Sequence, residues 1–112
     1  MLIDSHCHLD RLDLAAHGGS LDAALDAARA AGVGHFLCIG VSADNAAMVK
    51  GLAERYSDVD CSVGVHPLDL EPGAEPALDW LLGELAHPKV VAIGETGLDY
   101  HYEPESAALQ QA

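Results

Sequence analysis

The stretch His35-Phe36-Leu37-Cys38-Ile39-Gly40-Val41 is a compact run that is apolar after its first residue. Comparable short runs are Leu2–Asp4, Cys61–Val65 and Val90–Gly94. Runs of this kind, rich in Val, Ile and Leu and without polar alternation, are typical of strands buried on both faces of a parallel sheet. We therefore predict four parallel strands at these positions, paired in the order 1-2-3-4.

Amphipathic helical patterns occupy the first two segments between these runs. Ser20 is suited to cap the first helix, and Gly32 is suited to end it. The second helix is expected to start after Ser42 or Asp44. The apolar stripes are formed by Leu21, Ala24, Leu25, Ala28 and Ala31, and by Met48, Val49, Leu52, Ala53 and Tyr56.

A third helix is predicted from the stripe Leu78, Leu81, Leu82 and Leu85, with Pro76 near its first turn, and a fourth helix starts at Pro104. The predicted order is βαβαβαβ followed by an incomplete helix. Because such crossovers are right-handed, successive helices should lie on one side of the sheet. The fold class is therefore α/β, with four parallel strands and outer helices in a single domain, residues 1–112.

Composition and cysteine usage set the broad class of protein. The 112 residues, half of them hydrophobic, allow one domain with a modest core. No apolar run approaches the roughly 20 residues of a membrane span, and Met1-Leu2-Ile3-Asp4 does not resemble a signal peptide. The free, scattered residues Cys7, Cys38 and Cys61 suit a reducing compartment. We expect a cytoplasmic protein without a membrane partner.

The charge balance argues against one class of nucleic-acid binder. Eighteen acidic residues against five basic residues give a formal net charge of −13. The bases, which form no cluster, are Arg11, Arg29, Lys50, Arg55 and Lys89. The charge balance argues against tight nonspecific binding of nucleic acid through a basic surface, and an anionic substrate would need bound metal cations for attraction.

The residues that carry chemistry follow three of the predicted strands. They are Ser5-His6-Cys7-His8-Leu9-Asp10, then Gly64-Val65-His66-Pro67, then Gly94-Glu95-Thr96-Gly97-Leu98-Asp99. The carboxyl ends of parallel strands form one face of an α/β fold, and that face carries the active site. We therefore expect these three clusters to converge in space.

His6 and His8 are the sharpest feature of the sequence. Residues i and i+2 of an extended chain point to the same side, so both imidazoles can bind one cation while Cys7 points away. Imidazole suits Zn, Mn, Fe or Ni, and Glu95 can complete or bridge the site. Alternatively, two histidines at a strand end can simply form hydrogen bonds to the backbone.

Two further residues are candidates with open alternatives. His66 either lies close to the substrate or the metal, or simply ends a strand before Pro67. Asp99 either orients a metal ligand through a hydrogen bond or caps a turn.

In order and spacing, these three motifs resemble the signatures of the TatD family of metal-dependent hydrolases. The resemblance also includes Tyr100 and the pair Gln110-Gln111, and it covers essentially the whole chain. It implies the N-terminal half of a (β/α)₈ TIM-type barrel about twice this length. It also implies a divalent-metal enzyme, typically a deoxyribonuclease with exonuclease activity, with DNA as its substrate.

The resemblance further implies the roles of individual residues. His6 and His8 bind one metal ion, and Glu95 bridges two ions, for which Mg, Mn or Zn are candidates. The remaining ligands of the family, two histidines and an aspartate from later strands, have no counterpart in this sequence. We therefore expect a fragment that is inactive by itself, or a chain that pairs with a second copy through its exposed sheet edges.

Other functions stay open from the sequence alone. An H-x-H pair at the end of the first strand of a barrel also serves amidohydrolase-type enzymes, which cleave C–N bonds. A third interpretation is a non-enzymatic metal-binding or interaction module.

Overall fold

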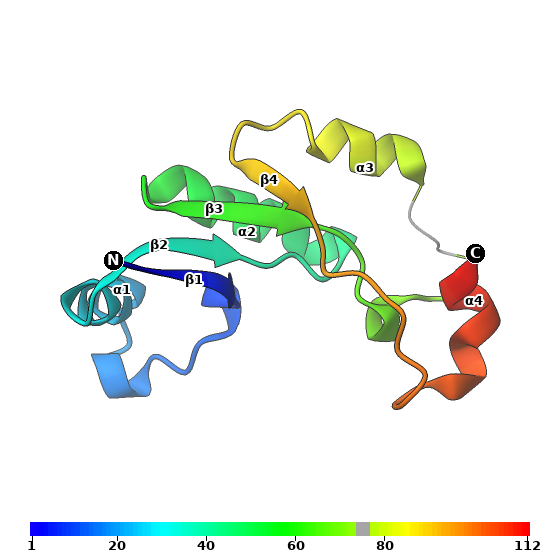
Figure 1. Ribbon diagram of the computed structural model, residues 1–112, viewed down its shortest axis with the longest axis horizontal. Helices are drawn as coiled ribbons and strands as arrows, with labels where there is room; N and C mark the ends of the chain where they lie inside the picture. The colour runs from blue at the N-terminus through cyan, green and yellow to red at the C-terminus, as the bar shows by residue number, and fades with distance from the viewer. Residues whose placement is uncertain (74–76) are drawn as a thin grey trace.

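The computed structural model describes residues 1–73 and 77–112. Its four strands form one parallel sheet in the order β1-β2-β3-β4, as the sequence predicts (Figure 1). The strands are β1 (Leu2–Cys7), β2 (Val33–Cys38), β3 (Val59–Val63) and β4 (Val90–Ile93). The helices are α1 (Leu21–Ala30), α2 (Ala43–Arg55), α3 (Leu78–Glu84) and α4 (Ala107–Gln111).

The helices begin where local capping chemistry predicts. Ser20 accepts a hydrogen bond from the backbone N–H of Ala23 at the start of α1, and Gly32 follows that helix with a positive φ of 101°. The second cap is Ser42 and not Asp44, because Ser42 and Asn45 exchange hydrogen bonds in a capping box. Pro104 opens a 3-10 turn, Pro104–Ser106, that leads into α4. Pro76 lies outside the described residues.

One core joins the sheet to the helices. β2 and β3 contribute Phe36, Cys38, Val59, Cys61 and Val63, while α1 and α2 contribute Leu25, Ala46, Val49 and Ala53. Trp80, Leu81 and Leu85, in and just after α3, pack against the same cluster. A single shared core means that these three helices cover the same face of the sheet, as the right-handed crossovers predict. In Figure 1, α2 lies behind β2 and β3.

The prediction that all four strands are buried on both faces is wrong for the two edge strands, β1 and β4. In β1, Leu2 and Ile3 are 63% and 61% exposed, and in β4 Val91 and Ile93 are 57% and 53% exposed. Each edge strand pairs with a neighbour on one side only, and no other described element covers these side chains. Burial on both faces is therefore nearly complete only in β3, whereas β2 buries Phe36 and Cys38 and leaves its other residues partly exposed.

The predicted apolar stripes of α2 and α3 each include residues that are not buried. Met48 in α2, and Leu78 and Leu82 in α3, are more than half exposed. Successive residues in a helix are 100° apart, so Met48 lies on the flank of the face on which Val49 and Ala53 are buried. The short α3 rests on the core through Trp80 and Leu81, and its other flank faces solvent.

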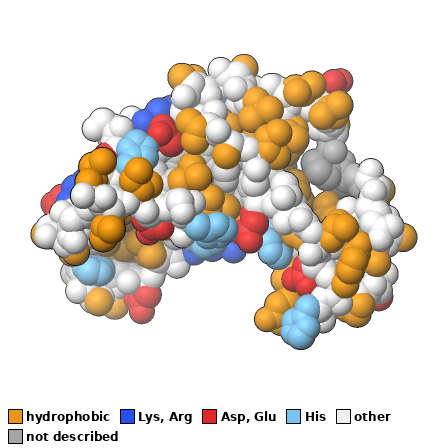
Figure 2. Space-filling model, in the orientation of Figure 1, with side chains coloured by type: hydrophobic (Ala, Val, Ile, Leu, Met, Phe, Trp, Pro, Cys, Tyr) orange, Lys and Arg blue, Asp and Glu red, His pale blue; other side chains and the backbone are white. Residues whose placement is uncertain are grey.

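The carboxyl ends of the four strands lie on the same side of the molecule, where the arrowheads of Figure 1 point. Figure 2 shows histidine side chains next to acidic side chains at the hollowed lower margin of the molecule. None of the helices in the described ranges combines the length and the apolar character that crossing a membrane requires.

Candidate metal centre

The end of β1 separates two histidines from the cysteine between them. The rings of His6 and His8 pack edge to face with centroids 5.2 Å apart, so both lie on the same side of the chain. The Cys7 thiol turns to β2 and donates a hydrogen bond to the carbonyl of Leu37 at 3.3 Å. Burial, reinforced by the nearby Asp4 carboxylate, raises the pKa of Cys7 to about 12. Cys7 is therefore a packed thiol and not a member of the histidine cluster.

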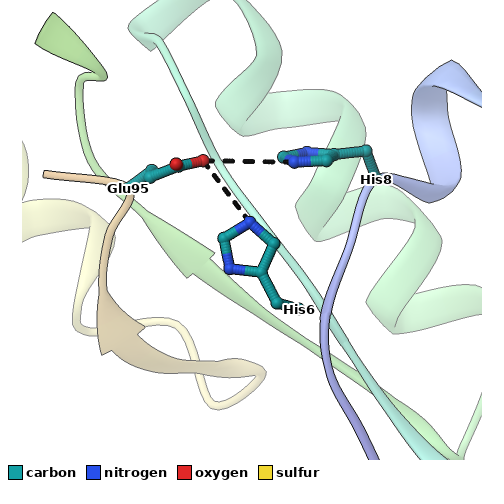
Figure 3. Close-up of side chains that lie close together, drawn as sticks. All are labelled: His6, His8 and Glu95. Atoms are coloured by element: carbon teal, nitrogen blue, oxygen red, sulfur yellow. Dashed lines mark ion pairs between the residues drawn. The ribbon is translucent and has the colours of Figure 1, made fainter. Parts of the chain in front are cut away.

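Glu95 follows β4 and faces both histidines (Figure 3). Its Oε2 lies 3.6 Å from Nε2 of His6 and 4.0 Å from Nε2 of His8. One ligand atom from each of these three residues lies within 4.8 Å of the other two. The convergence that the sequence predicts for the strand ends is thus present in the fold.

The donor set suits a divalent cation in its chemistry and spacing. Two imidazole nitrogens and a carboxylate oxygen are common ligands of zinc and related metals. Donor atoms around a tetrahedral ion with bonds of about 2.1 Å lie roughly 3.4 Å apart. The His6–Glu95 and His8–Glu95 spacings of 3.6 and 4.0 Å are close to this value, and the widest spacing in the cluster, up to 4.8 Å, needs a larger contraction. The three side chains are about a third to a half exposed, which leaves the cluster open to solvent and ligands.

His66 lies on the other side of the Glu95 carboxylate, with its Nε2 atom 3.7 Å from Oε1. Its backbone N–H donates to the carbonyl of Val41 at 2.7 Å, and its Nδ1 accepts the N–H of Leu68 at 3.1 Å. Because Nδ1 is an acceptor, the ring proton is assigned to Nε2. His66 therefore presents an N–H donor to the cluster and not the lone pair that a metal requires.

A pocket of about 380 Å³ joins these groups to a residue that the motif analysis did not single out. It is lined by His8, Arg11, Val41, His66, Leu68, Asp69 and Glu95. The Nε atom of Arg11 lies 3.9 Å from Asp10, and the side chain is 56% exposed. Its position directly after the His6–Asp10 motif was the only sequence signal for this cation.

Asp99 does not contact the cluster in this structure. Its Oδ1 accepts the backbone N–H groups of His101 and Tyr102 at 2.8 and 3.2 Å. Gln110 holds the same segment, since it accepts the N–H of Asp99 and donates to its carbonyl, both at 2.7 Å. Of the two alternatives that the sequence left open, these contacts correspond to the turn cap.

Asp10 and Asn45 brace the loops beside the cluster. The Asp10 side chain is only 4% exposed, and its Oδ2 accepts a hydrogen bond from Nδ2 of Asn45 at 3.2 Å. Asn45 also accepts the N–H groups of Val41 and Ser42. The hydrogen bond between Asp10 and Asn45 connects the loop after β1 to the start of α2. The other Asp10 oxygen and Nδ1 of His8 are buried and have no hydrogen-bond partner among the described residues.

Comparison with known proteins adds independent information. The family described as TatD related DNase matches residues 3–112. The chain is 37% identical over 110 residues to the uncharacterized metal-dependent hydrolase YcfH of Escherichia coli K12, covering 98% of this chain and 41% of YcfH. It is 32% identical over 111 residues to the uncharacterized metal-dependent hydrolase YabD of Bacillus subtilis, covering 99% and 42%.

A solved structure is similar in fold as well as in sequence. The crystal structure of YjjV, a TatD homologue from Escherichia coli K12, superposes with a TM-score of 0.73 at 34% identity, covering 97% of this chain and 42% of YjjV. The chain thus spans about two fifths of the length of these relatives, which is consistent with half of a barrel. With the family match extending over nearly all residues, the chain belongs to the TatD related DNase family.

Proposed function

We propose that this chain is the metal-binding part of a divalent-metal-dependent hydrolase that cleaves phosphodiester bonds in DNA. The observation that carries the proposal is the convergence of His6, His8 and Glu95 from the first and fourth strands within 4.8 Å. The relatives YcfH and YabD are described as metal-dependent hydrolases, and the family description includes the word DNase. Because the chain spans only part of these relatives, the activity is proposed for the whole protein.

Each residue of the site has a distinct task in this proposal. His6 and His8 hold the cation through Nε2, and Glu95 supplies a carboxylate oxygen. A bound divalent cation would polarise a phosphoryl oxygen and neutralise its charge. His66 can donate its Nε2–H to another phosphoryl oxygen, and Arg11 adds a positive charge at the rim of the same pocket.

The site is incomplete for chemistry that needs two cations. In the part of the chain that the structure describes, His6, His8 and Glu95 form the one group of three potential ligands that converges. A second cation would share only Glu95, and a single carboxylate holds a divalent ion weakly. We therefore expect the 112-residue chain to bind one cation and to cleave DNA little or not at all.

The first arm of the test is a Co²⁺ or Zn²⁺ titration of the purified chain and of Glu95→Ala. We expect one site per chain in the native protein and a loss of affinity of at least tenfold in the variant. A native chain that takes up no cation would overturn the proposed metal centre. That result would support the remaining alternative, a non-enzymatic interaction module.

The second arm compares substrates at high protein concentration with added Mg²⁺, Mn²⁺ or Zn²⁺. The expected result is slow, chelator-sensitive hydrolysis of bis(4-nitrophenyl) phosphate, no hydrolysis of 4-nitroacetanilide, and little cleavage of an end-labelled oligonucleotide. Hydrolysis of the anilide alone would support the amidohydrolase-type alternative. Robust DNA cleavage by a monomer would contradict the need for further ligands.

A further inference from the structure

Ser62 is a polar residue in the centre of an apolar strand. It lies in β3, between Cys61 and Val63, and it is only 1% exposed. The metal centre described above does not include it, because its hydroxyl faces backbone and not the cluster. A buried hydroxyl costs free energy unless it forms hydrogen bonds, so its partners indicate what it does.

The hydroxyl of Ser62 joins the chain segments that follow β2 and β4. Its Oγ accepts the backbone N–H of Gly40 at 3.2 Å and donates to the carbonyl of Gly94 at 2.9 Å. The same segments also meet directly, since the N–H of Glu95 donates to the carbonyl of Gly40 at 2.6 Å. The carbonyl and the N–H of the Gly94–Glu95 peptide are therefore both held, one by Ser62 in β3 and the other by Gly40 after β2.

Two glycines make this close approach possible. A Cβ atom at Gly40 would lie 2.5 Å from the carbonyl oxygen of Ser62, and one at Gly64 would lie 2.6 Å from the carbonyl carbon of Gly94. Any larger residue would push the segments apart and break the contacts to Ser62. These hydrogen bonds and close backbone contacts join five residues, which we call the Ser62 clamp: Gly40, Ser62, Gly64, Gly94 and Glu95.

We propose that Ser62 is a positioning residue, whose hydroxyl fixes the backbone of Gly94–Glu95 so that the Glu95 carboxylate faces His6 and His8. The proposal rests on the proposed function, in which these three side chains hold a cation. Glu95 lies beyond the end of β4, so strand pairing alone does not orient it. Its side chain is 30% exposed, and the fixed backbone beneath it limits the positions that the carboxylate can reach.

The expected effect of Ser62→Ala is a roughly tenfold loss of Co²⁺ affinity, at the lower end of what outer-shell substitutions do to metal sites. The absorption spectrum of bound Co²⁺ should also change, because the carboxylate ligand is less well held. Ser20→Ala is the matched control. It removes another serine hydroxyl that makes one backbone hydrogen bond, at the start of α1 and away from the cluster.

A double-mutant cycle distinguishes positioning from a general loss of structure. If Ser62 acts through Glu95, Ser62→Ala should change Co²⁺ affinity less than twofold in the background of Glu95→Ala. Circular dichroism melts of every variant confirm that each is folded at the titration temperature.

The possible outcomes separate this proposal from the proposed function. A native chain without Co²⁺ affinity would refute both. If Glu95→Ala weakens Co²⁺ binding while Ser62→Ala behaves like Ser20→Ala, the metal centre stands and the role of Ser62 is refuted. An equal loss from Ser62→Ala with and without Glu95 also refutes it, because the effect would not pass through the carboxylate.

Discussion

The Nε2 atom of His6 lies 3.6 Å from Oε2 of Glu95, although the two residues belong to opposite edges of the sheet. Neighbouring strands are about 4.8 Å apart, so the first and fourth strands of a flat sheet would be roughly 14 Å apart. In a flat sheet their side chains would also stand parallel to each other. The contact is possible because the segment after β4 leaves the edge of the sheet and reaches the carboxyl end of β2, where the N–H of Glu95 donates to the carbonyl of Gly40 at 2.6 Å.

Substitutions at neighbouring positions should separate the metal-binding histidine from the cysteine beside it. His6→Ala removes an imidazole ligand and should lower Zn²⁺ affinity by at least tenfold. Cys7→Ser keeps a hydroxyl that can donate to the carbonyl of Leu37, so affinity should change less than twofold. Isothermal titration calorimetry gives both values. Equal losses would place the thiol among the ligands.

Gly64→Ala should disturb both stability and metal binding. The new methyl group would lie 2.6 to 2.9 Å from backbone atoms of Gly94 and Glu95, an overlap that costs about 1–3 kcal/mol of unfolding free energy. Metal affinity should fall because the Glu95 segment must move.

The matched control for this change is Gly51→Ala, in the exposed interior of α2, where a Cβ meets nothing within 4 Å. It should raise the unfolding free energy by about 0.5–1 kcal/mol and leave metal binding unchanged. Urea unfolding and a Zn²⁺ titration measure the two quantities. A Gly64→Ala protein as stable as the native chain would contradict the close approach.

Acid should remove a contribution to stability that comes from Asp58. Arg29 donates to both of its carboxylate oxygens, at 2.7 and 2.9 Å, and these bonds hold the pKa of Asp58 below its ordinary value. The folded state therefore binds this proton less readily than the unfolded state. The stabilisation is complete above about pH 4 and is lost as the pH falls through the lowered pKa.

Melting temperatures between pH 2 and pH 6 test this linkage. Asp58→Asn should show a shallower loss of stability below about pH 4 than the native chain. Arg55→Ala removes an ion pair with Asp22 in which both side chains are 59% exposed, so its profile should parallel the native one. Identical profiles for Asp58→Asn and the native chain would show that the Arg29 pair contributes nothing.

Two leucines, one in α1 and one in α3, should differ sharply in their effect on stability. Leu25 in α1 is 1% exposed, and Leu25→Ala should lower the unfolding free energy by about 2–5 kcal/mol. Leu82 in α3 is 54% exposed, and Leu82→Ala should change it by about 0.5 kcal/mol or less. Urea denaturation checks both values. A comparable loss at Leu82 would mean that the exposed flank of α3 is covered in solution.

The two open sheet edges lead us to expect self-association. β1 and β4 each carry unpaired backbone groups and exposed apolar side chains, which favour pairing with another chain. Sedimentation velocity should detect a concentration-dependent dimer, and Val91→Glu at the β4 edge should weaken it. Met48→Glu, on α2 and away from both edges, is the charge-matched control, because Met48 is an apolar side chain that is 57% exposed, as Val91 is. A well-folded monomer at every concentration would refute the pairing.

Much of the local structure follows from the sequence because its causes are local. Short apolar runs predict the strands, Ser20 and Ser42 cap helices with their own hydroxyl groups, and alternation along the end of β1 places His6 and His8 on one side, with Cys7 on the other. Each of these features depends on residues within a few positions of each other. The arrival of Glu95 beside the histidines was also predictable, because parallel strands present their carboxyl ends on one face.

Other features depend on contacts between distant segments, and the tertiary structure alone decided them. The apolar runs of β1 and β4 resemble those of β2 and β3, but only the edge strands carry apolar side chains that are more than half exposed, because burial depends on what packs against a strand. The position of the proton on the His66 ring depends on the N–H of Leu68. The partners of the Ser62 hydroxyl, Gly40 and Gly94, are distant in sequence and are known only from the tertiary structure. The sequence by itself determined which side chains can bind a cation, whereas the path of the chain after β4 and the backbone contacts around Gly94 decided that they face one another.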